Sequence, residues 1–273
     1  MDEKKRVGAV ISGGGRNGAF AVGALYYLMS EKGVEFDVVS GTSTGALIAG
    51  PAIRGDIELL NDIYRGGVCQ SDVLDERVLP MALLQGAFNG IDPLVGLVRK
   101  YTDATALGHL WPKKKAVVTY VDMVLGEVRR CWSNNHAQWT DAVIASSVMP
   151  VLMDPWEIEG RMVGDGGLID VIPFAPLLKE DPDRVFALVN FPEKPEPLEA
   201  SPEGVLKKAA RAVDIMTYEI ARNDLEDGAW RLGNRLRVIR PDYELGDSLE
   251  FDPAEMTRIW QHGFDVAERV MTS

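Results

Sequence analysis

The sequence predicts an α/β fold with three layers, in which a mostly parallel central sheet is flanked by helices. Short apolar runs typical of buried strands alternate with helical stretches, and the first two strands each lead into an apolar helix through a glycine-rich turn. The 273 residues are 46% hydrophobic and 26% charged, which is enough for a sizeable core. Because no linker divides the chain, we expect a single domain over residues 1–273.

The first elements follow from apolar runs and glycine breaks. A strand is expected at 7–11, followed by a largely buried helix at 19–29. A second strand is expected at 36–41, followed by a helix at 44–53. The stretch 55–110 is predicted to be mostly helical, with breaks at glycine and proline. We interpret it as a helical layer on the sheet, and a cap that shapes an acyl-chain groove is the alternative.

The second half alternates short strands with helices, and its last helix has a clear start signal. Asp252-Pro253 combines an N-cap with proline in the first turn. Four prolines within 192–202 indicate a surface loop. The other expected elements are a hairpin at 116–122 and 127–132, a helix at 137–147, two short strands within 153–163, a helical turn at 174–179, a strand at 184–189, a long helix at 203–227, a strand at 236–239 and the closing helix to about 271.

Charge and composition exclude some classes of partner. The formal net charge of −12 argues against a nucleic-acid partner and against strong electrostatic docking on anionic lipid, although a local basic patch is compatible with it. Since no signal peptide or transmembrane stretch is found, we expect a cytoplasmic protein, with transient membrane-surface contact. Cys69 and Cys131 lack metal spacing, so no metal or other cofactor is expected. The oligomeric state stays open.

The five residues Gly41-Thr42-Ser43-Thr44-Gly45 stand between the second predicted strand and its helix. The pattern G-x-S-x-G is typical of a nucleophile elbow, in which glycines permit a tight turn that presents the serine beside a helix N-terminus. An ordinary glycine-rich turn is the alternative, because five-residue matches also arise by chance. Ser43 is the candidate nucleophile.

The loop from Gly13 to Gly18 contains G-x-G-x-x-G between a strand and a helix, which is also the dinucleotide-binding pattern. That interpretation requires an acidic residue at the end of the next strand, but this strand ends in the serine elbow and Asp37 stands at its beginning. Three consecutive glycines at a helix N-terminus also form a nest of N–H donors suited to an oxyanion. A tight turn without a ligand is the remaining alternative.

A serine nucleophile needs a base within hydrogen-bonding reach. The order Ser43, Asp165, His262 matches an α/β-hydrolase triad, but that fold builds several strands before its elbow, and only one strand–helix unit precedes Ser43. The other histidines, His109 and His136, lie in polar loops. Asp165 ends a predicted strand and is followed by two glycines, which leave room for another backbone segment. The sequence therefore favours Asp165 as the base.

With these three motifs in this order, the chain resembles the patatin-like phospholipases, lipid acyl hydrolases that use a Ser–Asp dyad. The resemblance is strong over about 6–54 and 140–176. It implies a patatin-like fold, catalysis by Ser43 and Asp165, and a lipid ester substrate cleaved through an acyl-enzyme. It also implies an oxyanion hole and a set of motif glycines. These are Gly13, Gly14, Gly15 and Arg16 for the oxyanion hole, and Gly18, Gly41, Gly45, Gly166 and Gly167 for the motifs.

Two positions depart from that family. Many members carry a cation just before the last glycine of the first motif, where this chain has Asn17, and whether Arg16 substitutes for it is open. Members often have asparagine shortly after the aspartate motif, where this chain has Asp170 and Val171. These departures leave a non-catalytic lipid- or partner-binding protein as an alternative, and an acyltransferase is a further alternative that the sequence leaves open. Head group, chain length and the position cleaved stay open.

Overall fold

The computed structural model describes residues 5–77, 87–195, 197–198 and 200–272. Within these ranges, eight strands form one sheet in the order β10–β9–β1–β2–β5–β8–β7, with β6 also paired to β5. The strands are β1 (Val7–Ile11), β2 (Val38–Thr42), β5 (Lys115–Asp122), β6 (Glu127–Trp132), β7 (Trp156–Ile158), β8 (Arg161–Asp165), β9 (Arg184–Leu188) and β10 (Leu236–Ile239), and the short β3 (Asp75–Glu76) and β4 (Asn89–Gly90) pair separately.

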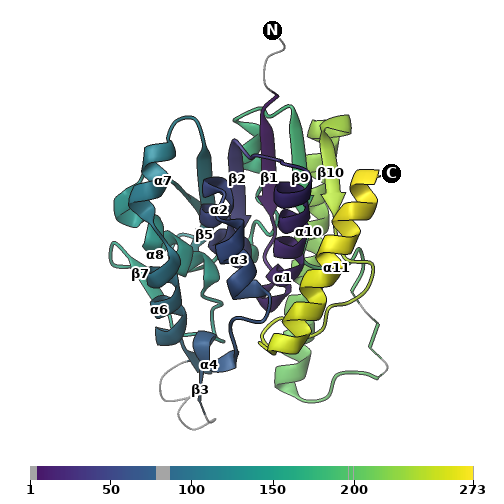
Figure 1. Ribbon diagram of the computed structural model, residues 1–273. Coiled ribbons are helices and arrows are strands. Elements are labelled where there is room, and N and C mark those ends of the chain that lie inside the picture. The colour runs from purple at the N-terminus through teal and green to yellow at the C-terminus, as the bar shows by residue number, and fades with distance from the viewer. Residues whose placement is uncertain (1–4, 78–86, 196, 199, 273) are drawn as a thin grey trace.

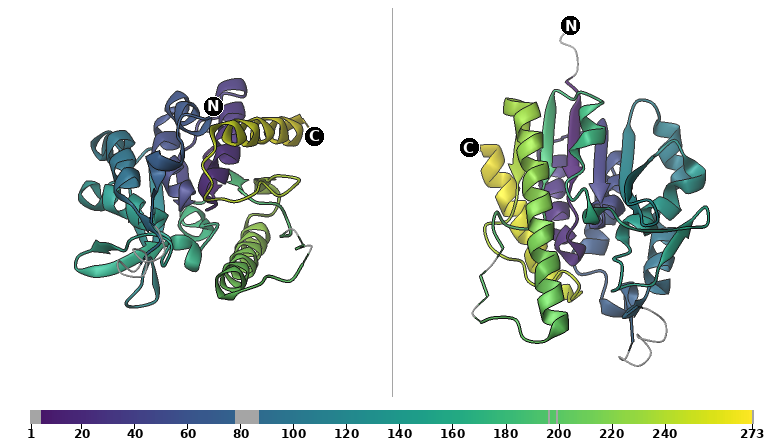
Figure 2. Two further views of the ribbon diagram at one scale, coloured as in Figure 1. Left: turned by 90° about the horizontal axis from the view of Figure 1, so that it is seen from below. Right: turned by 180° about the vertical axis from the view of Figure 1, so that it is seen from behind.

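Strands β10, β9, β1, β2 and β5 are mutually parallel, whereas β6, β7 and β8 join by antiparallel pairing. Helices cover both faces of this sheet (Figures 1 and 2). The helices are α1 (Gly18–Tyr26), α2 (Thr44–Arg54), α3 (Ile57–Tyr64), α4 (Gln70–Val73), α6 (Asp92–Tyr101), α7 (Ala104–Leu110), α8 (His136–Ser147), α9 (Phe174–Leu178), α10 (Val205–Leu232) and α11 (Pro253–Thr272).

Alternation along β1 creates a core on each side of the sheet. Ala9 and Ile11 are fully buried in the cluster under α1, α2 and α11. Val10 is fully buried in the opposite cluster, beside Phe174 of α9 and Ala221 of α10. This is the expected pattern for a central parallel strand that is covered on both faces. The predicted α/β class with a mostly parallel sheet between helices is therefore confirmed.

Most predicted elements appear within one or two residues of their expected ends, including the N-cap of α11, where Asp252 accepts a hydrogen bond from Glu255 N at 2.9 Å. Part of the predicted helical stretch, residues 78–86, lies outside the described residues. Helix α10 is longer than predicted because it continues through Gly228, where a Cβ would lie 2.6 Å from the Phe174 ring. Within the described part of the chain, no helix has the length and apolar character needed to cross a bilayer.

Candidate active site

Ser43 lies in the sharp turn between β2 and α2, with φ 56° and ψ −125°. A positive φ is uncommon for a residue with a side chain and is typical of strained functional turns. The turn is possible because α2 sits directly against β1, where a Cβ on Gly45 would lie 2.2 Å from the Ile11 carbonyl oxygen. The Ser43 amide donates a hydrogen bond of 2.8 Å to the Ser146 hydroxyl of α8, which itself donates to the Thr119 carbonyl oxygen. The elbow is thus fixed from two sides.

Strand pairing brings Ser43 and Asp165 together. Strand β6 occupies one edge of β5 along Val117–Asp122, so β2 and β8 both pair with the other edge. On that edge β2 ends at Thr42, opposite Thr119, and β8 arrives antiparallel and ends at Asp165, opposite Tyr120. The two strands therefore meet end to end, with the serine after one and the aspartate at the end of the other.

Asp165 is buried, with 5% of its residue surface exposed. Its burial raises the pKa of Asp165 to about 6, and hydrogen bonds from the Ser43 side chain and the Gly167 amide counteract that rise. The Gly167 N–H donates to Asp165 Oδ1 at 2.7 Å. Gly166 is required for a different reason, since a Cβ there would lie 2.4 Å from the Thr119 carbonyl oxygen. A buried carboxylate with few compensating bonds is a stronger base than one in water.

The glycine loop passes directly beside the serine. A Cβ on Gly13 would lie 3.3 Å from Ser43 Cβ, and Gly14 and Gly15 adopt positive φ values of 141° and 52°. Among these amides, Gly13 N–H donates to the Val171 carbonyl oxygen at 3.2 Å and Arg16 N–H to the Ser248 carbonyl oxygen at 2.8 Å. The amides of Gly14 and Gly15 donate no hydrogen bond to any described residue. Two N–H donors beside Ser43 therefore remain available to a ligand.

Arg16 is buried, and its guanidinium group binds the segment that follows β10. Nη1 donates to the Glu250 carbonyl oxygen at 2.8 Å and Nη2 to the Leu245 carbonyl oxygen at 3.1 Å. Gly15 packs against the same segment, since a Cβ there would lie 2.2 Å from Ser248 O. These bonds direct the guanidinium group to loop carbonyls, so Arg16 anchors the glycine loop through its side chain.

Asn190 is a residue of the site that sequence reasoning missed. It is fully buried after β9, and its amide Nδ2 donates to the Ser12 carbonyl oxygen at 2.9 Å and to Gly13 O at 3.4 Å. Its Oδ1 accepts from Ala21 N in the first turn of α1 at 3.2 Å. The signal in the sequence was a polar residue directly after a buried strand, at the carboxyl edge of a parallel sheet.

We expect Asn190→Ala to lower both stability and ester hydrolysis. The substitution leaves the buried Ser12 carbonyl group without its Asn190 partner, at a cost of about 1–3 kcal/mol in the free energy of unfolding, and it frees the glycine loop to move. Urea denaturation and kcat/KM on p-nitrophenyl butyrate measure the two effects. Asn234→Ala, on an exposed residue, is the control. An Asn190→Ala enzyme with the kcat/KM of the wild type would contradict this role.

The segment after Asp165 is held by residues that the sequence did not identify. Asp224 of α10 accepts hydrogen bonds from the Val171 and Ile172 amides at 2.9 and 3.0 Å. Asp170 pairs with Arg130 at 2.6 Å, and its carbonyl oxygen accepts from the Thr42 hydroxyl. Two aspartates therefore stabilise this loop, one of them from a distant helix.

The three histidines have other surroundings. His262 of α11 stacks against Tyr243 with ring centroids 4.4 Å apart and accepts a long hydrogen bond from Asp242 N. The prediction that His109 and His136 lie in loops was wrong, since His109 is in α7 and His136 is the first residue of α8, where its Nδ1 contacts the Ala104 carbonyl oxygen at 2.7 Å. In the described part of the chain, no group of three or more His, Cys, Asp or Glu side chains is placed to hold a metal ion.

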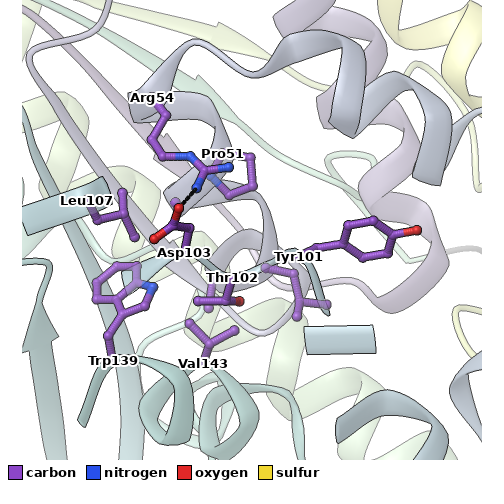
Figure 3. Close-up of a pocket in the computed structure, with 11 residues that line it drawn as sticks. Pro51, Arg54, Tyr101, Thr102, Asp103, Leu107, Trp139 and Val143 are labelled. Carbon is purple, nitrogen blue, oxygen red and sulfur yellow. Dashed lines mark ion pairs between the residues drawn. The ribbon is translucent and has the colours of Figure 1, made fainter. Parts of the chain in front are cut away.

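A separate pocket lies between α2, α7 and α8, and contains neither Ser43 nor Asp165 (Figure 3). Its volume of about 10 Å³ is just enough for one water molecule. Arg54 and Asp103 form an ion pair of 3.9 Å at this pocket, and the Trp139 and Leu107 side chains line it. This pocket is too small for an acyl chain.

Comparison with known proteins gives three findings. The family model described as patatin-like phospholipase matches residues 9–178, which include the glycine loop, the elbow and Asp165. Two uncharacterised NTE family proteins of Mycobacterium tuberculosis are 26% identical over 184 residues and 30% identical over 171 residues. These matches cover 67% and 62% of this chain but 48% and 27% of the relatives, so the chain spans about half of their length or less. The crystal structure of VipD from Legionella pneumophila has the same fold, with a TM-score of 0.52 at 16% identity over 99% of this chain and 67% of VipD.

Proposed function

Because this chain belongs to the family of patatin-like phospholipases, we propose that it hydrolyses lipid acyl esters, with Ser43 as the nucleophile and Asp165 as the general base. The observation that carries this proposal is the end-to-end meeting of β2 and β8 on one edge of β5, which places the serine hydroxyl against a buried carboxyl group. A serine with a base in contact is the minimum apparatus for acyl transfer.

In the proposed reaction, Ser43 Oγ attacks the ester carbonyl carbon while its proton passes to Asp165. The tetrahedral intermediate then collapses, the C–O bond to the leaving alcohol breaks, and Asp165 returns the proton to that alcohol. Water enters next, gives its proton to Asp165 and attacks the acyl-enzyme. The second intermediate collapses, the bond between the acyl carbon and Ser43 Oγ breaks, and Asp165 returns its proton to Oγ, which releases the fatty acid and restores the serine hydroxyl.

The amides of Gly14 and Gly15 are proposed to bind the oxyanion of both intermediates. Of the four residues expected from the resemblance, these two keep free N–H groups, whereas the amides of Gly13 and Arg16 donate to backbone carbonyl oxygens. The positive φ values of Gly14 and Gly15 shape the nest. Donors that are fixed before the reaction stabilise a developing charge without reorganisation. The N-terminus of α2, which begins at Thr44, adds a favourable dipole beside the same centre.

A fluorophosphonate probe tests the proposal directly, because it forms a covalent adduct with activated serines. We expect labelling of the wild type that is lost in Ser43→Ala and retained in Ser133→Ala. Ser133 is a buried serine whose hydroxyl accepts a hydrogen bond from Ala116 N at 3.1 Å. Fatty acid release from phospholipids, lysophospholipids and acylglycerols, compared with the Ser43→Ala variant, then identifies the substrate. Labelling of Ser43→Ala at the level of the wild type would refute Ser43 as the nucleophile.

A further inference from the structure

The amino-terminal half of α10 lies outside the packed body of the protein. From Lys207 to Met216, every residue except Arg211 is exposed, whereas the second half of the helix buries Ala221, Gly228 and Leu232. Val213 is 44% exposed and Met216 is 58% exposed. A helix in a globular protein normally buries its apolar side, so this half of α10 has an apolar surface without a partner among the described residues.

Four of the exposed apolar residues form one stripe, whereas Ala210 and Ile215, which is 48% exposed, lie outside it. Ala209, Ala212, Val213 and Met216 follow the spacing i, i+3, i+4 and i+7, which places them on the same side of the helix. We call these four residues the α10 stripe. The segment 205–216 also contains Lys207, Lys208 and Arg211 against one carboxylate, Asp214, in a chain whose net charge is −12. At 100° per residue, Lys208 borders the stripe next to Ala212, whereas Lys207 and Arg211 lie on the opposite side of the helix.

The α10 stripe lies at the same end of the molecule as the candidate active site. In Figure 1, β1 and β2 run downward from the N-terminus, so their carboxyl ends, where the glycine loop and Ser43 follow, are at the bottom. The view from behind in Figure 2 shows that α10 begins at that same end and extends beyond the strands. Leu168 and Ile169, three and four residues after Asp165, are also 42% and 41% exposed.

We propose that the α10 stripe, together with Lys207 and Lys208, docks the protein on the surface of a membrane or lipid aggregate that contains anionic lipid. This inference rests on the proposed function, because it states that the protein encounters its lipid substrate at a lipid surface. A helix with an apolar side and with lysines at its border and on its polar side suits the headgroup boundary, where the apolar side chains enter the acyl region and the long lysine side chains reach lipid phosphates.

A second copy of the chain is a less suitable occupant. Two of the four stripe residues are alanines, so the stripe offers little area compared with the surface that a stable dimer buries. A repeat of the same helix would also bring its lysines toward like charges. An anionic lipid surface complements both the apolar stripe and the lysines. Docking there would bring the lipid to the end of the molecule where the substrate must reach Ser43.

Vesicle co-sedimentation tests the proposal, with vesicles of phosphatidylcholine alone and mixed with phosphatidylglycerol. All proteins carry Ser43→Ala, so hydrolysis does not alter the lipid. We expect binding to the mixed vesicles, weakened about tenfold by V213S/M216S, which removes apolar insertion, and about tenfold by K207E/K208E, which reverses the charge. Trp230→Ser is the matched control, since Trp230 is 80% exposed on the opposite end of the same helix. It is expected to bind as the parent does.

Several results would overturn the proposal. These are no binding by the parent, equal binding by V213S/M216S, or an equal loss in Trp230→Ser. Gel filtration adds one more: a dimer that V213S/M216S dissociates would assign the stripe to a second copy. Vesicle binding requires no catalysis, whereas fluorophosphonate labelling of the protein with Ser43 intact requires no vesicle. Failure of the docking surface and failure of the proposed function are therefore distinguished.

Discussion

Asp165→Asn is expected to lower kcat/KM for p-nitrophenyl esters by about 10²–10⁴-fold, the usual contribution of a general base, while making the protein more stable at neutral pH. The loss arises because an amide cannot accept the Ser43 proton. The gain arises because the carboxylate is buried, with 5% of its residue surface exposed, and its pKa is raised to about 6 by that burial. One group would thus act in opposite directions on activity and stability.

The sign of the pH dependence follows from the raised pKa. Above about pH 6, Asp165 is ionised in both the folded and the unfolded chain, and the folded chain bears the full cost of burying the charge. As pH falls toward the ordinary value of 3.8, the folded state binds the proton first, and the cost disappears. A difference of about two pKa units corresponds to about 3 kcal/mol as an upper limit. We expect Asp165→Asn to add about 1–3 kcal/mol to the free energy of unfolding at pH 7, and nothing near pH 4.

Urea denaturation from pH 4 to pH 8 measures this difference between wild type and variant. Comparison with the wild type removes the contribution of Asp224, a partly buried residue whose pKa is also raised to about 6 by desolvation of its carboxyl group. Asp227→Asn, on the exposed side of α10, is the control and should not show this gain in stability at pH 7. The kcat/KM of the wild type should also fall as pH drops below about 6. Full activity of Asp165→Asn would refute the dyad, and an unchanged stability at pH 7 would refute the cost of burial.

Local chemistry explains which parts of this site could be predicted from the sequence. The elbow around Ser43 is contiguous, because a strand, a tight turn and a helix require glycines within five residues, and that pattern is readable without knowledge of the fold. The glycine loop is contiguous for the same reason. Asp165 could be predicted by its own turn and by elimination of the histidines, whereas the way it reaches Ser43 could not. That contact depends on β8 pairing with the part of one β5 edge that lies beyond the end of β2, and this pairing is determined by the whole sheet.

The supporting residues were unpredictable for a related physical reason. Asn190 and Asp224 bind backbone groups between 52 and 178 positions away in the sequence, and their own neighbourhoods have no distinctive pattern. Arg16 was noticed as a cation near the oxyanion loop, but its bonds to the Leu245 and Glu250 carbonyl oxygens depend on where the chain returns after β10. A hydrogen bond between distant segments is specified by their tertiary arrangement, so the residue types alone leave its partner open.

The second large expected effect concerns Gly45, the residue that lets α2 approach β1. We expect Gly45→Ala to lower the free energy of unfolding by more than about 4 kcal/mol. Losses of this size are exceptional and arise from severe steric clashes or from buried polar groups without partners. A Cβ at this position would lie 2.2 Å from Ile11 O and 3.0 Å from Ser12 O. Both are backbone atoms of the strand that leads into the glycine loop, so no flexible side chain can move aside.

Gly96→Ala provides the matched control, because it adds the same methyl group to a glycine inside another helix. Gly96 is exposed on α6, and a Cβ there meets nothing within 4 Å among the described residues. Removing the backbone freedom of that glycine should stabilise the protein by up to about 1 kcal/mol. Urea denaturation of both variants at pH 7 measures the contrast. If Gly45→Ala unfolded at the urea concentration of the wild type, the close approach of α2 to β1 could not be what holds Ser43 in its strained turn. If that folded variant were also active, the hydrogen bond from Ser43 N to Ser146 Oγ would instead be the interaction that holds the turn.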